Sequence, residues 1–241
     1  MSDLDDTLWR VSAYEKVLAD TGTSVFARHR SSTVLSTVLA TELDHLRYAR
    51  RADDVMEVVA ACLRQRENAL VLLRHNDLVW PVTLAAERGL YHVPRPIVAS
   101  LEAGNLDLQV IGVEPAGLRP SWDGSGPEFL PLAPLLWALA LFAPRPHLLD
   151  EIAGRAAFRL AANFRPDPSA LSGALGPALR RLHAESASLA DIARWHGMDR
   201  ERAVRLLNGV YLQGGLMVLR AHHAARSSSR GIDRLRRWLR P

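Results

Sequence analysis

One stretch decides the fold of the second half of the chain, Ser188–Leu207, which reads SLADIARWHGMDRERAVRLL. Ser188 and Asp191 have the spacing of a capping box, in which a hydroxyl and an acidic side chain bond the free N–H groups at the start of a helix. Gly197 fits the left-handed residue that ends a helix, and Asp199 can cap the next one. These signals predict two helices joined by a tight turn, over residues 189–196 and 200–213.

The small and apolar residues of this stretch have the spacing of a helix-turn-helix. The pattern consists of Ala193, Gly197, Ala203 and Leu206. A short apolar strand is expected at 216–219, so the segment 171–220 resembles winged-helix domains. The pattern from Leu189 to Val218 is also similar to PATAN-type domains of bacterial signalling proteins. The first resemblance implies DNA binding and the second implies protein contacts.

The outward side chains of the second helix are the candidate binding residues. Helical periodicity predicts that the following point outward: Asp199, Arg200, Glu201, Val204, Arg205 and Asn208. Arg and Asn pair well with guanine and adenine edges, so a DNA-binding protein would read bases with Arg200, Arg205 and Asn208. Arg194 and Arg202 would then contact phosphates. The two acidic residues at the helix start repel phosphate, and no return strand for a wing is evident after Arg220; both features favour protein contact.

The last residues predict an Arg-rich amphipathic helix over 227–241. Ile232, Leu235 and Trp238 share one face, while Arg234 and Arg237 lie on the remainder. Such a helix can dock on its own domain or lie on an anionic surface, including nucleic-acid phosphates. The candidate partner-binding or DNA-binding residues are therefore Arg194, Arg200, Arg202, Arg205, Asn208, Arg234 and Arg237.

The first half of the chain has a different pattern, and the sequence as a whole predicts an α+β protein. Helices are expected at 4–20, 34–46 and 53–63, and antiparallel strands at 69–73, 78–84, 90–93 and 106–113. Pro81 cannot donate to a strand ladder, which predicts an edge strand or a bulge there.

Residues 1–116 then form an acidic α+β module suited to sensing or dimerisation. The Pro- and Gly-rich segment 117–131 is the expected linker. Residues 132–226 form a mainly helical module, with helices at 133–143, 147–163 and 169–185 and the helix-turn-helix-like unit at 188–220.

The charge distribution supports two parts with different partners. The chain has 241 residues with 30 Lys and Arg against 26 Asp and Glu, a net charge of +4. Residues 1–130 carry 13 basic and 18 acidic side chains, whereas residues 131–241 carry 17 basic and 8 acidic ones. An anionic partner or a nucleic acid could therefore be bound by the second part. The rival explanation is that arginines cover solvated helix faces.

Several function classes lack their sequence signatures. There is no P-loop, no dinucleotide-binding glycine pattern and no nucleophile elbow, and the histidines have no metal-ligand spacing. The single cysteine, Cys62, lies in an apolar run and is expected to be a small buried residue. The acidic start argues against a signal peptide, and the longest uncharged run, Phe129–Pro144, is too short to span a membrane.

The sequence thus favours a bacterial, cytoplasmic regulatory or signalling adaptor that acts through protein contacts. It predicts no catalytic residues, no metal and no cofactor, and a homodimer is compatible with the first module. The alternative is a transcriptional regulator that binds DNA with the helix at 199–213.

Overall fold

The computed structural model describes residues 8–22, 34–104, 106–116, 128–143, 145–166 and 172–221. The chain divides into two compact units, Met1–Ala143 and Pro144–Pro241, and each is described by itself. Both units mix helices with antiparallel strands, as expected for an α+β protein.

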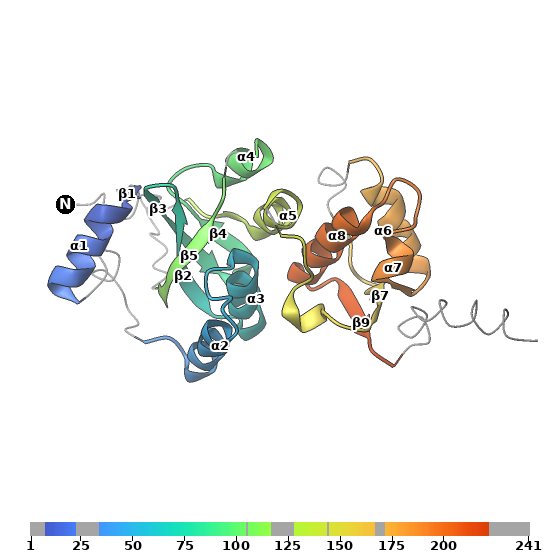
Figure 1. The fold of residues 1–241 in the computed structure, drawn as a ribbon, viewed down its shortest axis with the longest axis horizontal. Coiled ribbons are helices and arrows are strands. Elements are labelled where there is room, and N and C mark those ends of the chain that lie inside the picture. Colours follow the sequence, from blue (N-terminus) through green and yellow to red (C-terminus); the bar gives the residue numbers. More distant parts are fainter. Residues whose placement is uncertain are drawn as a thin grey trace, which may run out of the picture. The chain divides into compact units, whose positions relative to one another are not determined.

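The first unit is built on a sheet with the strand order β5-β2-β3-β4-β6 (Figure 1). A short further strand, β1, pairs with the start of β3. The strands are β1 (Trp9–Arg10), β2 (Asn68–His75), β3 (Leu78–Ala85), β4 (Leu90–His92), β5 (Gln109–Pro115) and β6 (Leu130–Pro131). All neighbouring strands are antiparallel, and β2 and β3 form the expected hairpin.

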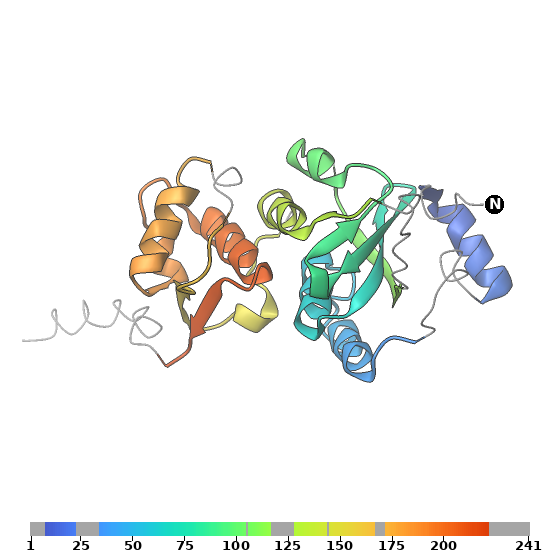
Figure 2. The same cartoon turned by 180° about the vertical axis from the view of Figure 1, so that it is seen from behind.

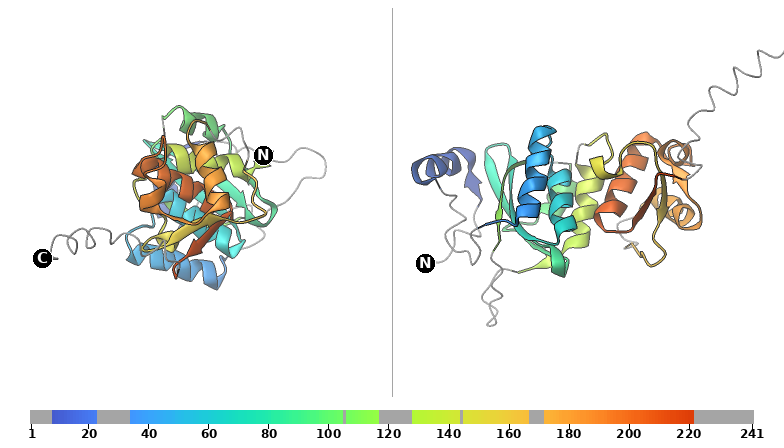
Figure 3. Two further views of the ribbon diagram at one scale, coloured as in Figure 1. Left: turned by 90° about the vertical axis from the view of Figure 1, so that its right-hand side faces the viewer. Right: turned by 90° about the horizontal axis from the view of Figure 1, so that it is seen from below.

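Helices cover both faces of this sheet, with α1 on one side and α2 and α3 on the other (Figures 1 and 3). The helices of the unit are α1 (Val11–Thr21), α2 (Thr37–Tyr48), α3 (Val55–Gln65), the 3-10 helix η2 (Ala86–Arg88), α4 (Ile97–Glu102) and α5 (Leu132–Phe142). Tyr14 of α1 packs on Leu70, Leu72 and Val79.

Helix α3 is the most buried helix on its side of the sheet. Asp54 caps it by accepting hydrogen bonds from the backbone N–H groups of Met56 (3.0 Å) and Glu57 (3.2 Å). Cys62 is fully buried in this helix, which confirms its expected role as a small core residue.

In its described residues, the second unit combines a three-stranded antiparallel sheet with helices (Figure 2). Its elements are the 3-10 helix η3 (Asp150–Ile152), β7 (Ala157–Leu160), α6 (Leu175–Ala184), β8 (Ala187–Ser188), α7 (Leu189–Ile192), α8 (Arg200–Leu212) and β9 (Leu216–Leu219). β7 lies between β8 and β9 in the sheet. The largest fully buried side chains of this unit include Phe158, Leu182 and Ile192.

The structure corrects the helix that we expected over 147–163. That segment contains the single turn η3 and the strand β7 instead. Gly154 interrupts it with a φ of +90°, a conformation that residues with side chains rarely adopt. A short run of apolar residues fits the period of a helix as well as that of a strand. Here the chain alternates as in a strand: Phe158 and Leu160 are buried, and Arg159 between them is exposed.

The boundary between the units also differs from the expected linker at 117–131. The chain divides after Ala143, and residues 117–127 lie outside the described ranges. β6 pairs with β4, and the backbone N–H of Leu132 donates to the Gly89 carbonyl (2.8 Å), so β6 and α5 belong to the first unit. Within the described residues, no helix is both long enough and apolar enough to cross a membrane.

Pro81 lies in an interior strand rather than at the edge of the sheet. On the side of β3 away from β2, β1 pairs only with Leu78 and Val79, and β4 pairs only with residues 83–85. Among the described strands, residues 80–82 thus have no neighbour on that side. Pro81 is tolerated because its missing N–H coincides with a gap in the ladder.

Candidate binding surface around helices α7 and α8

The start of α7 is held by the predicted capping box. The Ser188 hydroxyl accepts a hydrogen bond from the Asp191 backbone N–H (3.2 Å) and donates one to the Asp191 carboxylate (2.6 Å). Partial burial acts to raise the pKa of Asp191, but the hydrogen bonds from Ser188 and the charge of Arg194 outweigh it and hold the pKa below its ordinary value. The carboxylate is therefore ionised and fixed at neutral pH.

The turn between α7 and α8 depends on Gly197. Its φ is +73°, and a Cβ at this position would come within 2.8 Å of the Ala174 Cβ. Asp199 then caps α8 by accepting a hydrogen bond from the Arg202 backbone N–H (2.7 Å). Both roles agree with the sequence-based expectation, and they fix the angle at which α8 leaves the turn.

Three of the predicted binding arginines are paired with carboxylates of the same short segment. Arg194 forms an ion pair with Asp191, Arg202 lies 3.7 Å from the Asp199 carboxylate, and Arg205 lies 2.5 Å from that of Glu201. Arg202 also donates to the Gly197 carbonyl (2.7 Å). Each pair joins residues three or four apart, so the positive charge of this surface is largely balanced locally.

Arg200 differs from these three arginines. It is exposed at the first position of α8, and the described parts of the chain provide no hydrogen bond or ion pair to its side chain. Arg205 is only partly exposed, and its Nε is buried without a hydrogen-bond partner among the described residues.

The expectation that Asn208 and Val204 point outward is wrong. Asn208 is 1% exposed; its amide donates to the His147 carbonyl (3.0 Å), and its carbonyl oxygen accepts from the Leu149 N–H (3.0 Å). Val204 is fully buried. Packing surrounds the C-terminal half of α8, so Asn208 holds the segment before η3 and cannot read a base.

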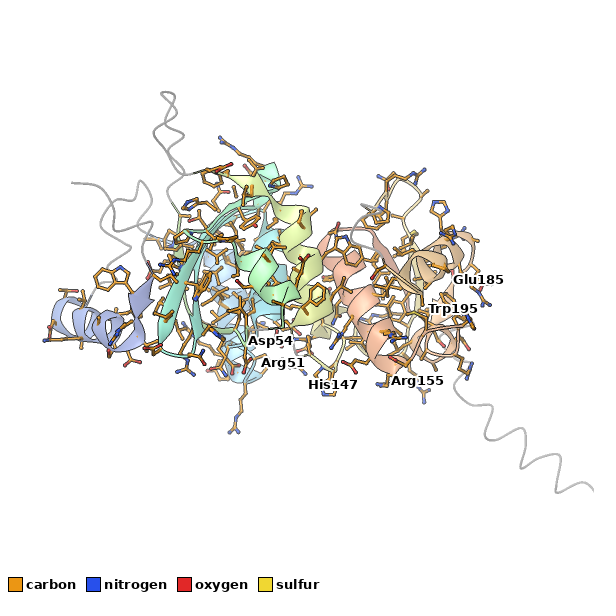
Figure 4. The ribbon with its side chains drawn as sticks, turned by 90° about the horizontal axis from the view of Figure 1, so that it is seen from above. Arg51, Asp54, His147, Arg155, Glu185 and Trp195 are labelled. Carbon is orange, nitrogen blue, oxygen red and sulfur yellow. The ribbon has the colours of Figure 1, made fainter. Side chains whose placement is uncertain are left out.

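A further pair on this surface escaped the sequence analysis. The guanidinium of Arg181, on α6, lies over the ring of Trp195 at 4.6 Å from its centroid and also pairs with Glu185. Figure 4 labels Glu185, which directly follows α6, and Trp195, which follows α7. The stacking joins residues from separate elements, so no local spacing in the sequence could have indicated it.

The remaining predicted site residues, Arg234 and Arg237, lie outside the described ranges, as does the tail helix at 227–241. Within the described ranges, no three His, Cys, Asp or Glu side chains gather as metal ligands would. Comparison of the chain with protein-family models, curated proteins and solved structures finds no significant match.

Proposed function

We propose that this protein is a regulatory or signalling adaptor and that its second unit binds another protein through the surface formed by α6, α7 and the start of α8. The observation that carries the proposal is the local pairing of the arginines with Asp191, Asp199 and Glu201. DNA binding draws its affinity from cations that replace the counterions of phosphate, and arginines already paired with carboxylates supply less of it.

The mixed surface has the composition of a protein interface. Arg and Trp are enriched among the residues that dominate protein–protein affinity, and here Arg181 and Trp195 are stacked and held in place. Arg200, at the start of α8, adds a charge that no described residue pairs. Such an arrangement favours a partner with an acidic and partly apolar surface.

The topology of the second unit supports a winged-helix-like arrangement. In this proposal, α6, α7 and α8 correspond to its three helices, and β8 and β9 correspond to the strands before the second and after the third helix. In the same proposal, β7, which precedes these helices, takes the sheet position that the return strand of a wing would have. Among the described residues, β9 pairs with β7 and with no strand that follows it in the chain.

Two experiments test the proposal. In the first, the full chain is titrated into a fluorescent random DNA duplex at low and at physiological salt. We expect no saturable binding at either salt concentration. Saturable binding whose affinity falls steeply with salt would overturn the proposal in favour of the DNA-binding alternative.

The second experiment isolates the partner from the cells that make the protein. Tagged full-length chain should recover a stoichiometric protein, and the double variant Arg200→Glu, Arg202→Glu should lose it. Arg159→Glu is the matched control, since Arg159 is exposed on β7 and does not belong to this surface. Equal recovery by all three chains would place the interface elsewhere and contradict the proposal.

A further inference from the structure

The second unit contains a groove that the proposed protein interface does not use. Its volume is about 430 Å³, within the range of small-molecule sites. Residues from one face of α6 line one side, and the end of β7 with the segment that follows it lines the other. The lining residues are Leu160, Phe164, Arg165, Pro166, Gly176, Leu179, Arg180 and His183.

The floor of this groove is apolar. Leu160 and Leu179 are each only 4% exposed. Phe164 is held by its backbone N–H, which donates to the Ala161 carbonyl (3.0 Å). Its ring lies directly on Gly215, where a Cβ would come within 2.3 Å of it, so the absence of a side chain at Gly215 sets the position of the ring.

The rim of the groove is basic. Arg165, Arg180 and His183 line it, and no acidic residue is among the described lining residues. The Arg165 guanidinium donates through Nη1 to the carbonyls of Ala162 (2.8 Å) and Phe164 (3.0 Å), which fixes its position at the rim. Arg180 is exposed, and no described residue provides its guanidinium with a hydrogen bond or an ion pair.

We infer that this groove binds a small amphiphilic carboxylate, such as a medium-chain fatty acid or an aromatic acid, as a free molecule. The apolar body would lie on Leu160, Phe164 and Leu179, and burial of that surface supplies affinity. The carboxylate would be bound by Arg180, because a guanidinium matches a carboxylate with two parallel hydrogen bonds. Gly176 opens the groove at the start of α6. This inference is independent of the proposed protein partner.

The test uses isothermal titration calorimetry with the full chain and two probes of equal chain length, decanoate and decylamine, both below their micellar concentrations. We expect saturable one-to-one binding of decanoate and none of decylamine, since the two probes have similar apolar chains but an anionic and a cationic head group. Equal binding of both probes would mean that the groove selects no anion. Binding to anionic lipid vesicles without binding of free decanoate would mean a membrane surface. Either result would overturn the inference.

Variants locate the binding. Arg180→Glu should weaken decanoate binding by about tenfold or more, through loss of a charge-assisted hydrogen bond. Arg159→Glu makes the same change of charge at a residue next to Leu160 in sequence. Because Arg159 points to the other face of the sheet, this variant should leave the affinity for decanoate unchanged. Gly176→Leu should fill the groove and abolish binding, while a melting curve shows that the variant folds. Full affinity in both Arg180→Glu and Gly176→Leu would show that decanoate binds elsewhere and refute the site.

Discussion

Cys62 is the residue whose chemistry its surroundings change most. Burial in α3, followed by the negative charges of Glu67 and Glu42, raises the pKa of its thiol to about 12. Because the thiolate is the reactive form, the native protein at pH 8 should react with Ellman's reagent roughly a thousandfold more slowly than a free thiol. In a strong denaturant the thiol should react at the ordinary rate. Rapid reaction of the folded chain would show that the thiol is accessible.

Asn208 is expected to be a stability residue. Asn208→Ala would leave the Leu149 N–H and the His147 carbonyl without partners in a buried site, which should cost about 2–4 kcal/mol of unfolding free energy. Denaturant unfolding of the full chain measures this cost. Arg200→Ala, at an exposed position of the same helix, is the control and should change stability by less than about 0.5 kcal/mol. An unchanged midpoint for Asn208→Ala would contradict its structural role.

The roles of single residues were predictable where they depend on neighbours in the chain. The caps at Ser188 and Asp199 and the left-handed Gly197 follow from local backbone requirements, and the structure confirms them. The burial of Asn208 was not predictable, because it depends on the segment around His147 packing against α8. Helical periodicity identifies faces, but it does not show how many of them are covered.

At the scale of elements, the capping box of α7 predicts a dependence of stability on pH. The pKa of Asp191 is lower in the folded chain than in the unfolded one, so its stabilising effect is complete above the unfolded pKa and is lost as pH falls through the folded pKa. Asp191→Asn should therefore lower stability at pH 7 by about 0.5–1 kcal/mol. The difference from the parent chain should shrink below about pH 4.

Melting temperatures of both chains from pH 7 down to pH 3 measure this effect. Arg194→Gln should cause only part of the loss of stability seen in Asp191→Asn, since the hydrogen bonds between Ser188 and Asp191 remain. A difference between the Asp191→Asn and parent chains that stays constant over the whole pH range would contradict the proposed ionised cap.

Elements with a clear period or a strong turn signal were predictable, and short apolar runs were not. The β2–β3 hairpin and the helix α8 match the expected segments closely. The segment 147–163 contains enough apolar residues for a helix, yet β7 forms there because its neighbours β8 and β9 provide strand partners on both sides. Those partners come from residues 187–188 and 216–219, and local sequence does not reveal such long-range pairing.

At the scale of the whole molecule, the difference in net charge between the two parts of the chain is the same whether the boundary is placed after residue 130 or after residue 143. Residues 131–143 carry no charged side chain, so residues 1–143 keep 13 basic and 18 acidic residues and residues 144–241 keep 17 and 8. Much of the positive charge in the described part of the second unit is nevertheless balanced or internally bound. Arg145 and Arg220, for example, donate to backbone carbonyls. Net charge alone therefore overstated the case for an anionic partner.

The position of the boundary leads to a test with matched fragments. Helix α5 packs against α4 in the first unit, and its Leu132, Leu135, Leu136 and Leu139 are buried in the full chain. Burial of four leucines contributes about 6 kcal/mol or more, comparable with the whole stability of a typical domain. The fragment 1–143 should therefore unfold cooperatively in denaturant, whereas the fragment 1–131 should lack a cooperative transition. If the fragment 1–131 unfolded as cooperatively as 1–143, the boundary would lie at the Pro- and Gly-rich segment, and α5 would belong to the second unit after all.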